Sequence, residues 1–362
     1  MINTQRLVDT FCEIVQIDSV SREEDAIAKD LTHRLKELGL DVVEDKFGNL
    51  VTIQKEVNPL ILSAHMDTVE PGRGIKPKVV DGRIVSDGTT ILGGDCKAGV
   101  ASILEAIASL RDDSVEHIPF QVVFTRGEEI GLIGAAHLDF DLLHGQNIVV
   151  FDGNGPVNTI TSMSPTSVHF DVKVVGRAAH AGVEPEKGLS AIRIAADIIM
   201  RLPQGRLDPE STMNIGKISG GLVRNAVPAE AEFAGEFRSR NAETVELLKL
   251  QVSSILEHAR DTYKDAKIEQ DAEVMFKMYQ LDGDDPIVKM VSSIMDTMGL
   301  NPDPRPSGGG TDANIFIDKG FNAVVVGMAT NAMHTVNEYV IVDELRDAAT
   351  FCEHLVKPKA GK

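Results

Sequence analysis

The stretch at residues 61–69, ILSAHMDTV, places a histidine and an aspartate in a pattern that suits metal binding. The short apolar run before His65 predicts a buried strand. Because residues i and i+2 of a strand share a face, His65 and Asp67 can lie side by side at its end. The carboxylate would accept a proton from one ring nitrogen and leave the other nitrogen facing a metal. Taken alone, the stretch favours an ordinary surface His–Asp pair, so its role depends on the rest of the chain.

Other acidic residues and a second histidine occupy comparable positions. Glu128 and Glu129 in TRGEEIG, and Asp152 in FDG, follow apolar runs that predict strands. Asp95 in GGDCKAG stands beside glycines and before a predicted helix, where the backbone can bend tightly and both carboxylate oxygens can reach out. His334 lies in AMHTVNEYV. Since sites in α/β sheets form at the carboxyl ends of strands, we expect these side chains to belong to one site.

The chemistry of this set favours a divalent metal. Two imidazoles with several carboxylates suit zinc or a similar ion, and the lack of cysteine ligands argues against a structural zinc site. Glu128 and Glu129 are adjacent, so the economical arrangement is one ligand and one general base that acts on a metal-bound water. The alternative is a solvated glutamate pair at a helix start, where acidic residues favour the dipole.

The order of predicted elements indicates two domains in a chain of 362 residues, which is too long for one ordinary core. Up to residue 162, strands alternate with helices, which predicts an α/β sheet covered on both faces. A β-α-β-β-α-β order then predicts a ferredoxin-like domain at 163–274, inserted into a discontinuous domain of 1–162 and 275–362. Near the start, helical periodicity predicts a helix at 4–16, and Ser21 with Glu24 predicts a capping box for the next helix.

Composition excludes several classes of function. The net charge of −19 argues against binding nucleic acid, because a phosphate backbone needs a basic face. No stretch approaches 18 apolar residues, so we expect no membrane span. The start of the sequence has no pattern of a signal peptide, and the three cysteines are odd in number and scattered. These features predict a cytoplasmic protein without a disulfide framework.

The motifs HMDTV, GGDCKAG, TRGEEIG, FDG and AMHTVNEYV, in this order, resemble those of the co-catalytic zinc exopeptidase superfamily. That superfamily includes aminoacylase, carboxypeptidase G, succinyl-diaminopimelate desuccinylase and peptidase T. The glycine-rich SGGGTDANIF at 307–316, and an aspartate at position 152, resemble the peptidase T branch. The resemblance implies a catalytic domain with a mixed sheet flanked by helices, and an inserted ferredoxin-like lid that also forms a homodimer.

The resemblance also implies a set of metal ligands. His65 and Asp152 would hold one zinc ion, Glu129 and His334 would hold a second, and Asp95 would bridge the two. Cobalt and manganese are alternatives to zinc.

Further roles follow from the same resemblance. Glu128 would be the general base, and Asp67 would orient His65. The family places a cis peptide after its bridging aspartate, which here would join Asp95 to Cys96. A thiol at position 96 could bind metal, although a small buried spacer fits better.

In the inserted domain, the resemblance implies contacts with substrate. His180 in GRAAHAG would stabilise the oxyanion, and Asn225 and Arg238 would bind substrate, with Gly309 of the glycine-rich segment. An arginine can grip the carboxylate of a peptide through two parallel hydrogen bonds. The alternatives for the first three residues are a loop histidine, a turn asparagine and an edge-strand arginine.

We therefore expect a cytoplasmic di-zinc metallopeptidase that removes the N-terminal residue of short peptides, above all tripeptides. Metal-activated water and a glutamate base would perform the hydrolysis. The nearest alternative keeps the site and changes the substrate, as in an N-acyl amino acid amidohydrolase, a desuccinylase or a carboxypeptidase. The alternative from another class is a non-catalytic binding protein on the same fold, which should have lost a ligand or the base.

Overall fold

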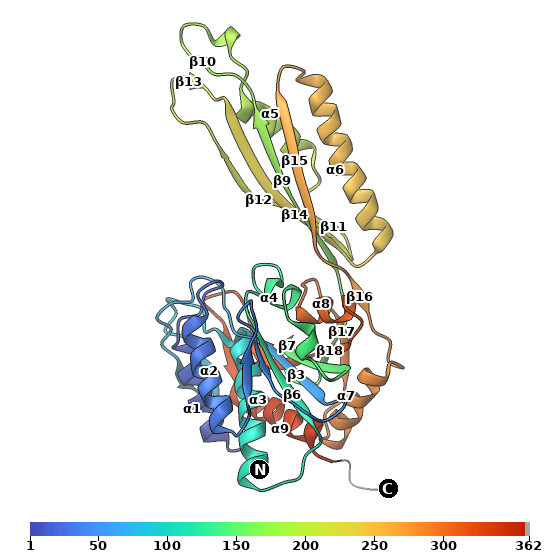
Figure 1. Ribbon diagram of the computed structural model, residues 1–362. Helices are drawn as coiled ribbons and strands as arrows, with labels where there is room; N and C mark the ends of the chain where they lie inside the picture. The colour runs from blue at the N-terminus through green and yellow to red at the C-terminus, as the bar shows by residue number, and fades with distance from the viewer. Residues whose placement is uncertain (359–362) are drawn as a thin grey trace. The chain divides into compact units, whose positions relative to one another are not determined.

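The computed structural model describes residues 1–358, and the chain divides into two compact units (Figure 1). The first unit comprises Met1–Ser162, Gln280–Ser307 and the residues from Thr311 onward. The second unit comprises Met163–Tyr279 and Gly308–Gly310. The chain therefore leaves the first unit after residue 162 and returns to it at residue 280.

A mixed sheet forms the centre of the first unit, with the strand order β1-β2-β6-β3-β7-β18-β19-β5-β4; β8 also pairs with β18, and β16 and β17 pair with β8. The strands are β1 (Val42–Glu44), β2 (Leu50–Thr52), β3 (Leu60–His65), β4 (Lys78–Val80), β5 (Arg83–Val85), β6 (Phe120–Thr125), β7 (Asn147–Asn154), β8 (Thr159–Ser164), β16 (Tyr279–Gln280), β17 (Asp303–Pro306), β18 (Asn322–Asn331) and β19 (Tyr339–Ile341). The four central strands β6, β3, β7 and β18 are parallel. Their carboxyl ends therefore meet at one edge of the sheet.

Helices pack on both faces of this sheet. They are α1 (Thr4–Val15), α2 (Asp25–Glu37), α3 (Gly94–Asp112), α4 (Ile133–Ala136), α7 (Pro286–Thr297), α8 (Asp312–Asp318) and α9 (Val342–Val356), with a 3₁₀ turn η1 (Phe140–Leu142). Leu62, Phe124 and Phe151 join the core formed with α1, α3 and α9. The alternate residues of each strand point to the opposite face, where α8 packs on β7 and β18. The predicted α/β class is confirmed.

The region before α2 corrects one local prediction. The predicted helix at 4–16 is present as α1, but Ser21 and Glu24 do not form a capping box. Helix α2 begins at Asp25, and Glu24 makes no capping hydrogen bond through its side chain. Instead, the Ser21 hydroxyl donates to Asp67 at 2.6 Å, and the Glu24 carboxylate accepts from the Gly127 N–H at 3.0 Å. Partners distant in sequence therefore outcompete the local cap.

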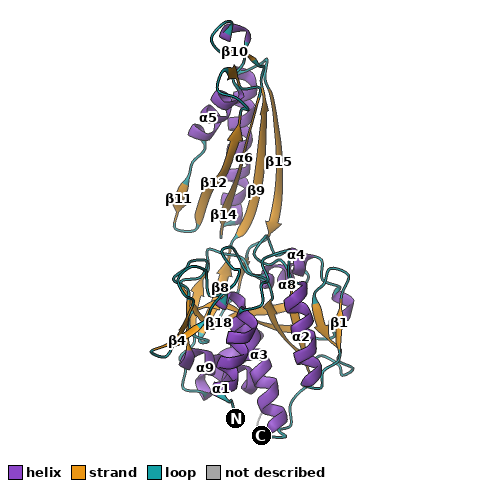
Figure 2. Cartoon of the chain, turned by 90° about the vertical axis from the view of Figure 1, so that its left-hand side faces the viewer, coloured by secondary structure: helices purple, strands orange, loops and turns teal. Residues whose placement is uncertain are grey.

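The second unit is an antiparallel sheet with the strand order β11-β12-β14-β9-β15. Its elements are β9 (Thr166–Val175), β10 (Ala179–His180), η2 (Pro185–Lys187), α5 (Ala191–Arg201), β11 (Gly205–Asp208), β12 (Ser211–Gly220), β13 (Ala226–Val227), β14 (Glu230–Ser239), α6 (Ala242–Thr262) and β15 (Lys267–Phe276). Figure 2 shows α5 and α6 on one face of this sheet, where apolar residues of both helices meet those of β9 and β14. The order β9-α5-β12-β14-α6-β15 is that of a ferredoxin-like sandwich.

Among residues 1–358, no helix has both the length and the apolar character needed to cross a membrane.

Candidate metal centre

The register of the parallel strands brings His65 and Asp152 together at the carboxyl edge of the sheet. His65 is the last residue of β3 and pairs with Thr125 at the end of β6. Asp152 lies inside β7, which continues to Asn154, so it does not follow the strand as the sequence suggested. The His65 Nε2 atom lies 3.5 Å from Asp152 Oδ1. Both side chains are buried.

The turn before α3 presents Asp95 to both predicted histidines. Gly93 has φ +73°, a left-handed conformation that favours glycine, and Asp95 keeps a non-helical ψ of 108°. Asp95 Oδ1 lies 3.2 Å from His65 Nε2, and its Oδ2 lies 3.1 Å from His334 Nε2. The peptide bond between Asp95 and Cys96 is cis, as the resemblance implied. The two oxygens of one carboxylate thus face two different imidazoles.

The second histidine completes another group of donors on the far side of Asp95. His334 lies in the loop after β18, and its Nε2 is 3.0 Å from Glu129 Oε1. Its side chain is 51% exposed, whereas that of His65 is 1% exposed. Hydrogen bonds that the ring donates to the carboxylates of Asp95 and Glu129 raise the pKa of His334 to about 10. Without a cation in the site, this imidazole is therefore protonated at neutral pH.

Asp67 connects His65 to the loop that contains the two glutamates. The His65 Nδ1 atom lies 3.1 Å from the Asp67 backbone carbonyl and 3.3 Å from its carboxylate. The same carboxylate accepts hydrogen bonds from the backbone N–H groups of Glu128 and Glu129, at 3.0 and 3.3 Å, and from Ser21. Burial opposes ionisation of Asp67, but the hydrogen bonds from His65 and Ser21 lower its pKa. One ionised carboxylate therefore fixes both the ring and the loop.

Electrostatics disfavours leaving this acidic cluster without a cation. Burial, and then the charge of Asp152, raises the pKa of Glu128 well above its usual value. Burial also raises the pKa of Asp152 to about 7, against the opposing effect of His65. Burial and the neighbouring charge of Asp95 raise the pKa of Glu129. A bound divalent cation would favour the ionised form of each carboxylate.

The donor atoms fit a metal ion by their proximity and chemistry. Within residues 1–358, three groups of side chains have ligand atoms within 4.8 Å of one another, and each of His65, Asp95 and Glu129 belongs to two of these groups. The groups are His65 with Asp95, Cys96 and Asp152; His65 with Glu128 and Glu129; and Asp95 with Glu129 and His334. Imidazole nitrogens and carboxylate oxygens are the donors that zinc and related ions take in hydrolytic sites.

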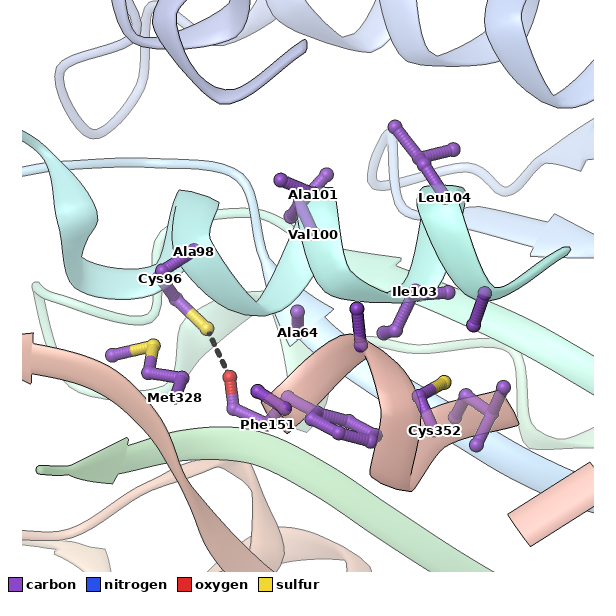
Figure 3. Packing of buried hydrophobic residues seen from close by; sticks show 14 of the residues in the cluster. Ala64, Cys96, Ala98, Val100, Ala101, Ile103, Leu104, Phe151, Met328 and Cys352 are labelled. Carbon is purple, nitrogen blue, oxygen red and sulfur yellow. Dashed lines mark hydrogen bonds between the residues drawn. The ribbon is translucent and has the colours of Figure 1, made fainter. Parts of the chain in front are cut away.

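Cys96 lies beside the centre, but its sulfur is engaged elsewhere. Figure 3 shows its Sγ atom directed at the Phe151 carbonyl, to which the thiol donates a hydrogen bond at 2.7 Å, among buried residues such as Ala64 and Met328. Burial raises the pKa of this thiol well above its usual value, which disfavours the thiolate that a metal would bind. These contacts fit a small buried spacer.

The candidate substrate-binding residues all belong to the second unit. The exposed His180 pairs with Ala226, and the Ala181 N–H donates to the Asn225 carbonyl at 3.0 Å, so His180 and Asn225 lie on neighbouring segments. Arg238 on β14 is half-buried and donates to Glu236 at 2.9 Å.

Gly309 is placed elsewhere in this unit, where its carbonyl accepts a hydrogen bond from the Ser164 hydroxyl at 2.9 Å. The roles of these four residues toward a substrate stay predictions.

Three buried charged residues near the cluster were missed by sequence reasoning. Asp312, in the first turn of α8, accepts a hydrogen bond from Thr125. Lys97 in α3 is buried, and burial lowers its pKa to about 8. Glu338 accepts three backbone N–H groups from the turn before α3. All three lie within the quoted motifs, but their partners are too distant in sequence for spacing to identify them.

Comparison with known proteins decides the family. Residues 61–357 match the model of peptidase family M20/M25/M40. The chain belongs to this family. It is a hydrolytic peptidase, and the resemblance predicted from the motifs is confirmed.

Relatives that match nearly the whole chain agree with this assignment. The crystal structure of a tripeptidase from Staphylococcus aureus is 36% identical, covers 99% of this chain and 98% of its own, and has a TM-score of 0.89. That of aminopeptidase PepT from Bacillus cereus is also 36% identical over 98% of both chains, with a TM-score of 0.83. The uncharacterized protein YqjE of Bacillus subtilis is 36% identical over 99% of this chain and 100% of its own length.

Proposed function

We propose that this peptidase is a di-zinc aminopeptidase that releases the N-terminal residue of short peptides, above all tripeptides. The observation that supports this most directly is the likeness, at 36% identity over nearly the whole chain, to proteins described as aminopeptidase PepT and as a tripeptidase. The cluster of two histidines and several carboxylates supports the metal dependence. Zinc is the first candidate because of the mixed nitrogen and oxygen donors, with cobalt and manganese as alternatives.

The residues present divide into two sets around Asp95. His65 and Asp152 would hold one ion, and Glu129 and His334 would hold the other. Asp95 would bridge the two, since its two oxygens lie 3.2 and 3.1 Å from the two imidazoles. When bound, such ions lower the pKa of a coordinated water and polarise a substrate carbonyl.

Glu128 is the general base of this proposal. Its backbone N–H donates to Asp67, and its Oε2 atom lies 4.0 Å from His65 Nε2, so the carboxylate faces the ligand set from a buried position. There it can take a proton from the attacking water and return it to the amine that leaves. The adjacent Glu129 contacts His334 instead. The two neighbouring glutamates can therefore take different roles, Glu128 as the base and Glu129 as a metal ligand.

The two parts of the chain take different roles in the proposal. The first unit, close to the expected 1–162 and 275–362, would be the catalytic domain, and the second unit, close to the expected 163–274, would be a lid that also mediates a homodimer. On the family resemblance, His180 stabilises the oxyanion, while Asn225, Arg238 and Gly309 bind substrate. The exposure of His180 and Asn225 leaves both side chains open to solvent and supports this role.

The test is hydrolysis of a tripeptide with three different residues, by metal-stripped protein and after zinc or cobalt is added back. We expect metal-dependent release of the N-terminal residue first. Glu128→Gln should lower kcat by about 10²–10⁴-fold, because it removes general-base catalysis. The variant should still bind metal, since its proposed role is proton transfer, and metal content is measured on the same sample.

Other outcomes would redirect the assignment. Release of the C-terminal residue first would indicate a carboxypeptidase. Release of acetate from acetyl amino acids, with no attack on tripeptides by the metal-loaded protein, would indicate an amidohydrolase. Either result contradicts the aminopeptidase proposal.

A further inference from the structure

Glu338 holds the turn that presents Asp95. It lies four residues after His334 and is only 1% exposed. Its Oε2 atom accepts hydrogen bonds from the N–H groups of Leu92 and Gly93, both at 2.8 Å, and its Oε1 atom accepts from the Asp95 N–H at 3.0 Å. The carboxylate therefore accepts hydrogen bonds from three backbone N–H groups that lie about 240 residues earlier in the sequence.

The turn needs such an acceptor because of its own geometry. The left-handed Gly93 and the non-helical Asp95 precede the regular part of α3, so their N–H groups lack the partners that a helix interior supplies. A buried N–H without a partner costs about 1–3 kcal/mol. With Glu338 in place, the turn is satisfied in the one conformation that directs Asp95 between His65 and His334.

A buried cation lies close to this arrangement. The Lys97 side chain is fully buried, and among residues 1–358 its Nζ atom has no hydrogen-bond partner. The charges of Asp67 and Glu338 act on it, and a β-carbon at Gly93 would lie 3.8 Å from its Nζ. The positive charge of Lys97 therefore attracts both of these carboxylates, which offsets part of the cost of burying them.

We propose that Glu338 is a positioning residue that fixes Asp95 for both metal ions at once. The inference rests on the metal centre of the proposed function. Asp95 belongs both to the group with His65 and to the group with His334. Loss of Glu338 should therefore lower the affinity for both ions together, whereas loss of His334 should lower the affinity for one of them.

The experiment is metal binding by full-length Glu338→Gln, measured by competition with a chromophoric chelator and by the visible absorption of bound Co²⁺. The amide keeps the size of the side chain but turns one acceptor into a donor that faces N–H groups. We expect both affinities to fall about 10–100-fold, the usual loss for a residue that orients a ligand. The Co²⁺ spectrum should change, because the ligand geometry changes.

Glu353→Gln is the matched control. Glu353 is 3% exposed and accepts hydrogen bonds from the Ser109 hydroxyl, at 2.6 Å, and from the Lys357 ammonium, at 2.5 Å. It is a buried, hydrogen-bonded carboxylate on α9 that takes no part in the donor groups. This variant should lose thermal stability but keep metal affinity and the Co²⁺ spectrum. Glu338→Asp keeps the charge but has a shorter side chain, and it replaces Glu338→Gln if that variant does not fold. It should also lower the affinity for both ions.

The outcomes separate the two proposals. If the wild type binds two ions and the Glu338 variants bind both as tightly with the same spectrum, the positioning role is wrong. A lower affinity for one ion alone also contradicts this role, because a displaced Asp95 should affect both ions. If the wild type binds no metal, the metal centre of the proposed function fails, and the inference falls with it.

Discussion

The His65 side and the His334 side of the proposed metal centre differ in burial and in support. His65 ends a central strand and is 1% exposed, whereas His334 lies in a loop with φ +62° and is 51% exposed. Behind His65, Asp67 accepts hydrogen bonds from Ser21 and from the loop that contains Glu128. The His334 ring contacts Asp95 and Glu129, which are themselves candidate ligands.

This difference indicates that the ligands on the His65 side are preorganised, whereas the position of His334 depends on a bound ion. On the His65 side, the strand, the Asp67 carboxylate and the packing of β3 fix the donors before any metal arrives. On the His334 side, the imidazole is half-exposed in a loop, and its contacts are with other candidate ligands. We infer that the ion on the His65 side binds more tightly and exchanges more slowly than its neighbour.

The largest expected effect comes from removing each histidine. His334→Ala should keep one bound ion, on the His65 side, whereas His65→Ala should lose the tight ion and also destabilise the fold. The destabilisation should be about 3–5 kcal/mol, because Asp152 would be left buried without its imidazole partner and Asp95 would keep His334 but lose His65. Both variants should lower tripeptide hydrolysis by more than about 100-fold, since a residue that merely supports a ligand is worth 10–100-fold.

Metal content by elemental analysis and unfolding in denaturant measure the two effects. If both variants lose the same amount of metal and of stability, the proposed difference between the His65 side and the His334 side is wrong.

The same contrast explains which residues the sequence could reveal. Strand alternation places His65 at a strand end, and parallel strands bring Asp152 to the same edge, so short-range rules suffice. Asp95 was predictable because the adjacent glycines mark a tight turn.

Apart from Asp67, the supporting residues could not be found in this way. Glu338 and Asp95 are separated by 243 residues, and no local pattern encodes their contact. Ser21 and Glu24 gave a clear local signal for a helix cap, yet both side chains bind the site loops instead.

A second, smaller effect should appear in the pH dependence of the metal-free protein. Asp95 and Glu129 raise the pKa of His334 from 6.5 to about 10. A folded-state pKa above the unfolded value means that protonation stabilises the fold. This contribution is complete below about pH 6.5 and is lost as the pH rises through about 10. His334→Gln should therefore flatten the decline of the melting temperature over that range.

Thermal unfolding of the metal-stripped wild type and His334→Gln, from pH 6 to pH 10, measures this contribution. Because the side chain is half-exposed, solvent screening keeps it modest. Parallel curves for the two proteins would show that His334 has no ionic partners in the metal-free state.

The smallest predicted effect on metal binding tests the support behind His65. Ser21→Ala removes the 2.6 Å hydrogen bond to Asp67, which should cost about 1–3 kcal/mol because the acceptor is ionised. Ser102→Ala is the control, since that buried hydroxyl donates to the Ala98 carbonyl within α3. Both variants should lower stability in urea, but only Ser21→Ala should weaken metal binding, by a few-fold and on the His65 side. If the two variants bind metal alike, burial alone distinguishes the His65 side, and the Asp67 network contributes only to folding.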